Sequence, residues 1–551
     1  MSINDLNSHQ QSFDRIENSY ITTWCRFHPE SALEVGIEEH AGKLKPHDDE
    51  NMGIQIVLNE KCLAALDEID FDQLDDERKI HFQILHGCAE LEHHSLMEHD
   101  WRHRDPTQFL PINAIHQLTI RPVENCAKAL KERLTAIPTH IRDAKNYLGT
   151  VPEVIPKVWL EMALAEAEAG IHYFHQLHHH PIIEQAIESD DSIEQAIADA
   201  TKAIEGFVPT LKRLLPHCEG EFACGREYFE RLLKQHHFLP INSQSLYEFG
   251  QRLFEETKTE LDAELSASDL TIASIQQDHP QAEQLITYYQ QEIKAAQDFL
   301  REYDLVTLPA QQELKVIITP EFLQHQIPFA AYLDPSIADL SQTGYYYVTP
   351  VHNDDELAEH NYAAISQTSV HEAWPGHHLQ FVTANQSEHG SQLLRRLHPS
   401  ATLYEGWALY CEQMMLEQGF EHHQGQKIVM LRDRLWRALR IMIDVEIHTQ
   451  GLSLEDAAQK MVDALGFSHE HAMGELNWYS QSPTIPMSYA VGWALINALR
   501  DIINPGNTAE LKAFHDTLLS SGSIALPLVI QRQFGHDVWQ KCCEHVFGDH
   551  E

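Results

Sequence analysis

The sequence lacks long apolar runs and a disulfide framework. No stretch of 18 apolar residues occurs, which predicts that no segment spans a membrane. The first residues form neither a basic segment nor an apolar one, so we expect no secretory signal. The nine cysteines are scattered and odd in number, which fits a reduced compartment better than disulfide bonds. Together these absences predict a cytoplasmic protein.

Positive charge is also scarce. The 551 residues include 39 Lys and Arg against 83 Asp and Glu, a formal net charge of -44. So much negative charge repels nucleic acid phosphates and anionic membrane surfaces, and we expect neither as a partner. Histidines number 38, and several cluster, as at 178–180. We expect most of them on solvated helix surfaces, so their number alone does not predict a metal site.

Internal repeats and linkers rich in Gly, Ser or Pro are absent as well. Apolar residues at three-to-four spacing predict a mainly α-helical fold. The clearest helical segments are 157–177, 194–215, 243–266 and 281–303, and residues 400–482 contain no proline. Only 315–319 and 344–351 have the composition of strands. We therefore expect a single domain over 1–551, with a helical amino-terminal region (1–310) and a region that carries the chemistry (311–551).

The segment HEAWPGHHLQ, residues 371–380, is close to a zinc protease signature, in which a second histidine follows the first by four residues. Here that position is Pro375, and the next histidines are His377 and His378. On a straight helix His377 would point away from His371, and His378 would lie about 10.5 Å along the axis. Neither spacing suits two ligands of one zinc ion.

Pro375 and Gly376 suggest how the motif could still bind metal. Pro375 has no N–H for the carbonyl of His371, so the helix must open there. Gly376 tolerates backbone angles that other residues resist. An expansion by two residues would bring His377 to the place of the ordinary second histidine. The alternative is a kinked helix with surface histidines, and this segment alone favours neither.

Glutamates favour the metal site. Glu372 follows His371 directly, where it could take a proton from a water that the metal activates. Catalytic zinc commonly has a third protein ligand, and residues 403–418 place Glu405 and Glu412 on one face of a buried helix. We predict Glu405 as the third ligand and Glu412 as a carboxylate that orients a ligand histidine. The alternative partners of these two carboxylates are the arginines at 432, 434, 437 and 440.

Three segments, HEAWPGHHLQ, EGWALYCE and PMSYAVG (486–492), together resemble the bacterial family known as domain of unknown function 885. That family is similar in helical architecture to oligopeptidases, angiotensin-converting enzyme and thermostable carboxypeptidases. The resemblance extends motif by motif over residues 315–535. It implies a mainly α, zincin-like helical body with a deep channel and a small β element beside the metal helix. Dipeptidyl peptidase III is a precedent for a lengthened zinc motif, with one extra residue rather than two.

For the metal, the resemblance implies that His371, His377 and Glu405 hold one Zn²⁺ ion per chain. It also implies that Glu372 is the general base. The choice of His377 over His378 rests on the geometry of the expanded motif, and His378 stays open as the ligand.

For the substrate, the resemblance implies that Tyr489 donates a hydrogen bond to the developing oxyanion and that His448 contacts substrate. Either residue could instead be structural, in the core or at a helix end. The chain departs from the family pattern at Ile485, where a Gln is common, and at Trp478, where an Arg is expected. Related helical peptidases pair a strand beside the zinc with the substrate backbone, and we hypothesise that Tyr345–Val348 does so here. A plain core strand is the alternative.

The motifs therefore predict a zinc-dependent metallopeptidase that hydrolyses short peptides. One alternative is a catalytically degenerate metal- or peptide-binding protein, which the two departures would favour. Another is a zinc hydrolase of a non-peptide amide or ester, which would use the same chemistry. The oligomeric state and the position of the cleaved bond are left open.

Overall fold

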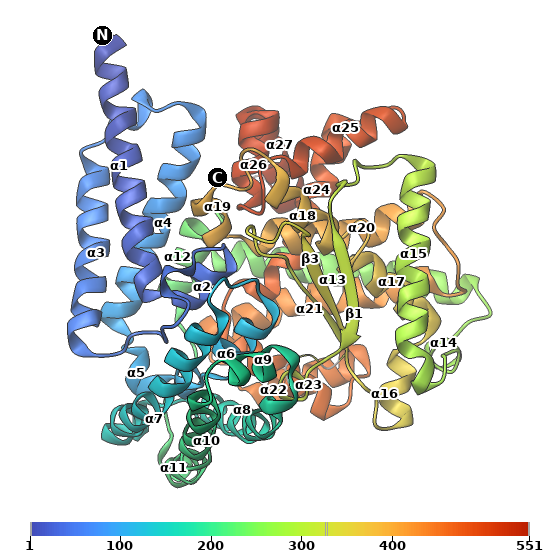
Figure 1. The fold of residues 1–551 in the computed structure, drawn as a ribbon. Coiled ribbons are helices and arrows are strands. Elements are labelled where there is room, and N and C mark those ends of the chain that lie inside the picture. Colours follow the sequence, from blue (N-terminus) through green and yellow to red (C-terminus); the bar gives the residue numbers. More distant parts are fainter. Residues whose placement is uncertain (1–2, 325–326, 328, 549–551) are drawn as a thin grey trace. The chain divides into compact units, whose positions relative to one another are not determined.

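The computed structural model describes residues 3–324, 327 and 329–548. It is mainly α-helical, as the sequence predicts, with one small β-sheet. The chain divides into two compact units, which can be followed by colour in Figure 1. The first comprises Met1–Phe222, Glu321–His325 and Ser336–Asp339, and the second comprises Ala223–Pro320, Gln326–Pro335 and Leu340–Glu551.

The boundary between the units differs from the boundary expected between the two regions of the sequence. It lies near residue 222 rather than near residue 310, so residues 223–310 belong with the unit that carries the expanded motif. The prediction of a single domain over residues 1–551 stays a prediction.

The first unit consists of helices joined by short turns and loops. Its α-helices are α1 (Ile3–Phe27), α2 (Pro29–Glu34), α3 (Asp49–Asp67), α4 (Asp76–Glu98), α5 (Trp101–Arg104), α6 (Ile112–Ile120), α7 (Cys126–Thr150), α8 (Lys157–Gln176), α9 (Pro181–Ser189), α10 (Ser192–Glu205) and α11 (Val208–Leu214). Helices α1, α3 and α4 lie side by side. Asp48 and Asp75 cap α3 and α4 by accepting hydrogen bonds from backbone N–H groups in their first turns, which fixes where both helices begin.

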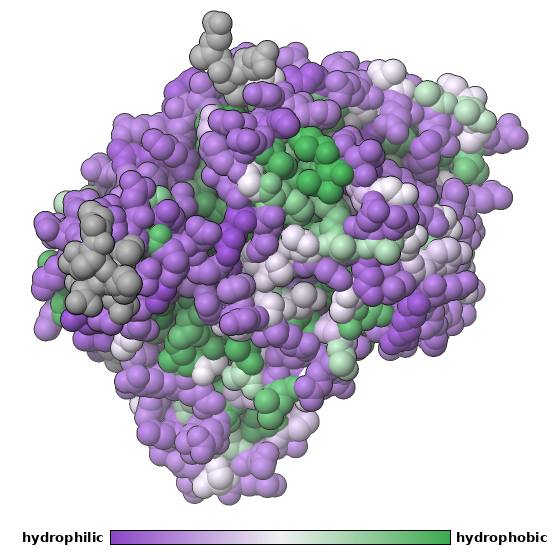
Figure 2. Space-filling model, turned by 90° about the horizontal axis from the view of Figure 1, so that it is seen from above, coloured by the Kyte–Doolittle hydropathy of each residue, from purple (hydrophilic) through white to green (hydrophobic). Residues whose placement is uncertain are grey.

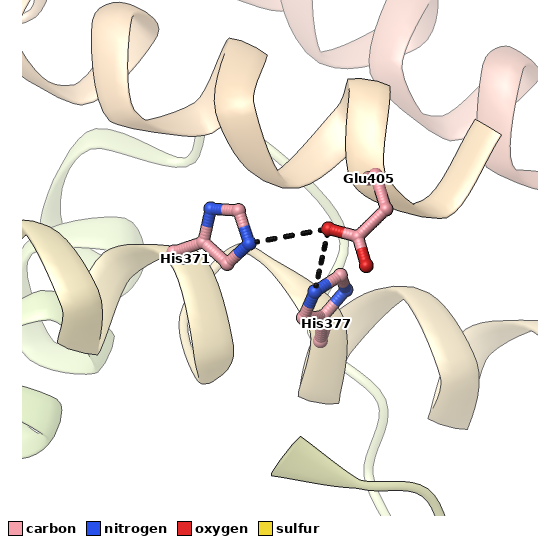
Figure 3. A group of neighbouring side chains, drawn as sticks. All are labelled: His371, His377 and Glu405. Carbon is pink, nitrogen blue, oxygen red and sulfur yellow. Dashed lines mark ion pairs between the residues drawn. The ribbon is translucent and has the colours of Figure 1, made fainter. Parts of the chain in front are cut away.

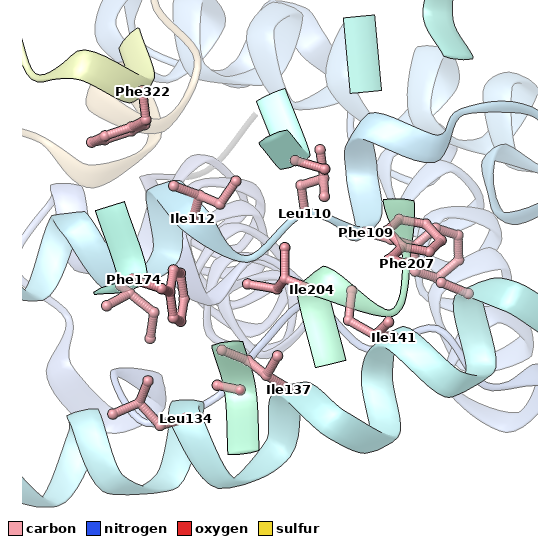
Figure 4. Packing of buried hydrophobic residues seen from close by; sticks show 14 of the residues in the cluster. Phe109, Leu110, Ile112, Leu134, Ile137, Ile141, Phe174, Ile204, Phe207 and Phe322 are labelled. Carbon is pink, nitrogen blue, oxygen red and sulfur yellow. The ribbon is translucent and has the colours of Figure 1, made fainter. Parts of the chain in front are cut away.

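A hydrophobic core holds the other helices of this unit together (Figure 4). Helix α8 contributes Leu160, Ala163, Ala167 and Phe174, whose spacing places them on one face. Phe322, from the segment 321–325, packs into the same core. The predicted helix over 194–215 is instead two helices, α10 and α11, because Pro209 would remove a backbone donor inside a longer helix and fits only in a first turn.

The second unit contains the remaining helices and the sheet. Its α-helices are α12 (Arg226–Gln235), α13 (Ser243–Ala267), α14 (Ile272–Gln276), α15 (Leu285–Tyr303), α16 (Asp354–Glu359), α17 (Tyr362–Glu372), α18 (His377–Gln386), α19 (Leu393–Leu397), α20 (Ala401–Glu417), α21 (Gln426–Thr449), α22 (Leu454–Leu465), α23 (His469–Gln481), α24 (Ile485–Ile503), α25 (Thr508–Leu519), α26 (Leu526–Phe534) and α27 (His536–Phe547). The proline-free interval 400–482 forms four of these, α20 to α23, as expected.

The sheet has three strands in the order β1-β3-β2. β1 (Glu313–Ile318) runs parallel to β3 (Thr343–Val348), and β2 (Ala330–Leu333) runs antiparallel to it. Both predicted strands are confirmed, while β2 is too short to show a pattern in the sequence. Every residue of Tyr345–Val348 has a partner on both sides, so the hypothesis that this segment pairs with a substrate is wrong. The edges of the sheet are β1 and β2.

None of the described helices is both long and apolar enough to cross a bilayer. Hydrophilic side chains cover most of the face shown in Figure 2, with smaller hydrophobic patches between them. The cytoplasmic location stays a prediction.

Helices α20 and α24 approach each other through two glycines. A Cβ on Gly406 would lie 2.5 Å from the Cα of Gly492, and a Cβ on Gly492 would lie 2.1 Å from the carbonyl oxygen of Thr402. Both distances are shorter than any real contact, so the two backbones can touch only where side chains are absent. This contact fixes the distance between Glu405, which precedes Gly406, and Tyr489, one turn before Gly492.

Replacing Gly492 should therefore destabilise the second unit. We expect Gly492→Ala to lower the free energy of unfolding by roughly 1–3 kcal/mol, because its methyl group must push two backbones apart. Gly474→Ala is the matched control: it lies inside α23, where a Cβ meets nothing within 4 Å, and should be neutral or mildly stabilising. Denaturant unfolding of both variants measures the difference, and equal stabilities would contradict the close contact.

Candidate metal centre

The expanded motif forms two helices with a fold-back between them. α17 ends at Glu372 and α18 begins at His377. Between them, the N–H of Gly376 donates to the carbonyl of Val370 at 3.0 Å. A Cβ at Gly376 would lie 1.7 Å from the carbonyl oxygen of His371, so only glycine fits there. The predicted opening of the helix at Pro-Gly is confirmed, and the alternative of a kinked helix with surface histidines is wrong because both His371 and His377 are buried.

Helix α20 holds this fold-back in place. The indole Nε1 of Trp407 donates to the carbonyl oxygen of Pro375 at 2.8 Å. Trp407 lies on the face of α20 opposite Glu405 and Glu412, and both faces are largely buried, as the sequence predicts. The same helix therefore supplies a carboxylate to the site and a hydrogen bond to the loop that shapes it.

His371, His377 and Glu405 come together as a group that could hold a metal ion. Figure 3 shows the Glu405 carboxylate reaching from α20 toward the imidazoles of α17 and α18. Its Oε2 atom lies 3.4 Å from Nε2 of His371 and 3.3 Å from Nε2 of His377. Ligands bound to one zinc ion at roughly 2.0–2.1 Å in a tetrahedron are separated by about 3.3–3.4 Å. The spacing fits a shared ion.

Two buried polar atoms of this cluster, Oε2 of Glu405 and Nδ1 of His377, have no hydrogen-bond partner among the described residues. A buried carboxylate oxygen without a donor is costly unless a cation satisfies it. The donor set of two imidazoles and one carboxylate is typical of catalytic zinc sites that leave one position for water or substrate. The residues present therefore fit the metal that the motif implies.

Glu412 is placed as predicted. Its Oε1 accepts a hydrogen bond from Nδ1 of His371 at 2.7 Å, and its side chain is almost fully buried. This contact leaves Nε2 of His371 to face the metal position and orients the ring, the usual role of a carboxylate behind a ligand histidine. Burial lowers the pKa of His371, but the interactions with the carboxylates of Glu405 and Glu412 outweigh it and raise the pKa to about 10.

Glu372 lies beside the cluster and faces His377. Its Oε2 is 4.0 Å from Nε2 of His377, and no hydrogen bond to Glu372 is formed by the described residues. From Ser369 to Gln380 it is the one side chain that is not buried. Burial of its surroundings raises the pKa of this carboxylate, and the nearby histidines His371 and His377 offset part of the rise. A carboxylate in this position is free to hydrogen-bond a water molecule.

His378 points away from the cluster. Its Nε2 donates to Oε1 of Gln312 at 2.8 Å, which leaves Nδ1 to accept from the hydroxyl of Tyr332 at 2.9 Å. Burial lowers the pKa of His378 to about 3, so the ring stays neutral. Of the two histidines left open by the sequence, the structure brings only His377 to the other two predicted ligands, His371 and Glu405.

The arginines proposed as alternative partners of the two carboxylates pair elsewhere. Arg432 pairs with Glu359, Arg434 with Glu260, Arg437 with Asp433 and Arg440 with Glu475. Glu405 and Glu412 instead pair with the histidines of the motif, so the arginine alternative is wrong.

Tyr489 lies near the cluster on α24. Burial, and then the charge of Glu405, raises the pKa of its phenol well above the usual value, so it stays protonated and able to donate. The guanidinium of Arg440 sits 4.9 Å from the centre of its ring. Arg440 also donates to the hydroxyl of Tyr479 and to Glu475. A guanidinium therefore lies beside Tyr479 although the position expected to carry one is Trp478.

His448 is not part of the metal cluster. Its Nε2 donates to the carbonyl of Tyr479 at 2.9 Å, and its Nδ1 accepts from the N–H of Cys224 at 3.4 Å. Burial lowers its pKa to about 4. Both ring nitrogens hold backbone in place, which favours the structural alternative for His448 over contact with substrate.

Three aromatic side chains near His377 do not stand out in the sequence. Tyr332, Phe381 and Tyr404 each place a ring centre about 6 Å from that of His377. Phe381 lies four residues after His377, and Tyr404 directly precedes Glu405. This closeness to the motifs is the sign in the sequence that both could lie near the site. Tyr332 lies on the short strand β2, for which the sequence offers none.

The comparisons with known proteins bear on this site. The model of the family described as "Bacterial protein of unknown function (DUF885)" matches residues 29–532, most of the chain. The protein belongs to the DUF885 family. The resemblance drawn from the three motifs is thereby confirmed. A search of curated proteins finds no match to this DUF885 chain.

Solved structures with the same fold exist. A candidate lipoprotein from Colwellia psychrerythraea has a TM-score of 0.77 at 19% identity and covers 95% of this chain and 98% of its own. A candidate lipoprotein of unknown function from Shewanella oneidensis has a TM-score of 0.73 at 21% identity, covering 95% and 99%. Both show the fold of this DUF885 chain. Trypanosoma cruzi metallocarboxypeptidase 1 is less similar in structure. It has a TM-score of 0.40 at 12% identity and covers 98% of this chain and 100% of its own.

Substituting any of the three predicted ligands should remove the metal ion, while substituting the neighbouring His378 should not. After dialysis against a weak chelator, we expect one Zn²⁺ per wild-type chain and none in His371→Ala or Glu405→Ala. The adjacent histidines form a matched pair: His377→Gln should lose the ion, and His378→Gln should keep it because its ring faces Gln312 and Tyr332. Elemental analysis, with a melting curve for each variant, measures this. Equal metal in all four variants would show that other histidines bind it.

Metal uptake should also depend on pH. A histidine must lose its proton to bind a metal, and the neighbouring carboxylates hold that proton on His371 with a pKa of about 10. The apparent affinity should therefore rise about tenfold per pH unit between pH 6 and 8. Competition with a coloured chelator measures the slope, and Glu412→Gln should flatten it by freeing His371 at lower pH. An affinity that is constant over this range would contradict the linkage.

Proposed function

We propose that the protein is a zinc-dependent metallopeptidase that hydrolyses short peptides. One observation supports the proposal: the carboxylate of Glu372, which accepts no hydrogen bond from the described residues, lies beside the group formed by His371, His377 and Glu405. Three protein ligands with a carboxylate next to them are the minimum set for hydrolysis by a metal-activated water. Bound zinc would supply a Lewis acid that polarises the scissile carbonyl and makes water more acidic.

The side chains of the chain would handle the protons. The carboxylate of Glu372 accepts a proton from the attacking water and gives it to the departing amine. Its raised pKa brings it closer to that of the groups it exchanges the proton with. Glu412 keeps His371 oriented through the hydrogen bond to Nδ1. Tyr489 remains a phenol and donates to the oxyanion, with its ring held against Arg440.

An extended peptide suits the surroundings of this group. Tyr332 of the edge strand β2 stacks on His377, with the ring planes 21° apart. An edge strand can take up an extended chain by main-chain hydrogen bonds, and β2 offers such an edge where β3 does not. This placement supports a peptide over a compact amide or ester substrate.

The central test is Glu372→Gln. This change keeps the size of the side chain and removes its ability to accept a proton. We expect unchanged metal content and a loss of about 10²–10⁴-fold in kcat/KM on peptides. Mass spectrometry of a mixed peptide library, with small amides and esters as a separate panel, measures the products.

Glu470→Gln is the control for this test, since Glu470 is an exposed residue of α23 and should not affect hydrolysis. Full activity in Glu372→Gln would rule out its role as the base. A wild-type protein that returns every peptide and every amide or ester intact would support the alternative of a binding protein without turnover.

A further inference from the structure

Three aromatic rings lie next to the imidazole of His377. Tyr332 stacks on His377 at 6.3 Å between ring centres, and Phe381 and Tyr404 lie 6.0 and 6.1 Å away. The rings also contact one another, with Phe381 6.2 Å from Tyr332 and 5.5 Å from Tyr404. We call Tyr332, Phe381 and Tyr404 the aromatic wall.

Each of the three side chains of the aromatic wall is partly exposed. Between Ala401 and Glu412 of α20, only Tyr404 and Glu405 remain partly exposed. On α18, Phe381 is partly exposed while the residues next to it are buried. Large aromatic side chains gain free energy by burial, so those left open in a buried region are candidates for contact with a ligand.

The exposure of the wall coincides with that of the proposed catalytic groups. Glu372 is the partly exposed residue of its segment, and Tyr489 is the one between Pro486 and Gly492. Tyr404 directly precedes Glu405 on α20, and Tyr489 lies close enough to both for electrostatic interaction. The wall and the proposed catalytic groups are therefore partly exposed side chains in one neighbourhood around His377.

Contacts with neighbouring residues fix the positions of Tyr332 and Phe381 in the wall. The hydroxyl of Tyr332 donates to His378, which is itself fixed by Gln312. Gly344 of β3 packs directly against this pair, since a Cβ there would lie 2.5 Å from the Tyr332 hydroxyl. The guanidinium of Arg396 lies 5.6 Å from the ring centre of Phe381. A rigid apolar surface selects ligands by shape better than a mobile one.

We infer that the aromatic wall is a side-chain subsite that selects a large apolar residue, aromatic above all, next to the scissile bond. The inference rests on the proposed peptidase function and adds the class of peptide that it prefers. Aromatic rings favour offset or edge contacts with further rings, which a substrate Phe, Tyr or Trp would provide. Small or charged side chains would leave the wall without a partner or bury a charge against it.

The test compares peptides that differ at one residue on either side of the cleaved bond. Wild type should cleave peptides with Phe at one of these positions faster than those with Ala, by a ratio in kcat/KM of about 10–200. Phe381→Ala should lower this ratio at least tenfold, and the milder Phe381→Leu should lower it partly while metal content stays the same. Phe534→Leu is the matched control, a half-buried phenylalanine of α26 that packs on Phe514.

The outcomes separate the two proposals. Cleavage without preference for large apolar residues, or a preference that Phe381→Ala and Phe381→Leu leave unchanged, would overturn the subsite while the peptidase function stands. No cleavage of any peptide by wild type would overturn both. If Phe534→Leu lowered the ratio of kcat/KM between Phe and Ala peptides as much as Phe381→Leu does, the preference would depend on packing in general. That result would also overturn the subsite.

Discussion

The carbonyl oxygen of His371 occupies the space that a side chain at position 376 would need, and the centre depends on this contact. Because Gly376 has no Cβ, the chain can fold back against α17 and bring His377 to within ligand distance of Glu405. An unbroken helix could not place two histidines six residues apart on one ion. The hydrogen bond from Trp407 to Pro375 then ties the fold-back to α20, which carries Glu405, the predicted third ligand.

The charges of the centre are balanced only as a set. Glu372, Glu405 and Glu412 bring three carboxylates into a region of low exposure, and each needs a cation or a donor. His371 serves two of them, through Nε2 and Nδ1. A divalent ion at the shared position would satisfy Oε2 of Glu405 and would leave Glu372 as the carboxylate that can exchange a proton. The arrangement explains why one histidine contacts two glutamates.

The sequence predicts the parts of this site that follow from local rules. The need for Gly376, the pairing of Glu405 with the histidines and the position of Glu412 all follow from helix geometry and from the cost of buried charge. Long-range placement does not: the ring of His378 turns away because Tyr332, on a strand of four residues, holds it. Arg440 likewise reaches Tyr479 from another helix, which no local pattern reveals.

Helix α20 shows that residues far from the reacting atoms can tolerate substitution as poorly as residues next to them. Its front face carries Glu405, and its back face carries Trp407, whose indole shapes the loop between the two histidines. Gly406, between them, allows α24 to approach. In a library of random variants, these three consecutive positions should all be depleted for three unrelated reasons: the proposed metal ligation by Glu405, the helix contact at Gly406 and the support of the loop by Trp407.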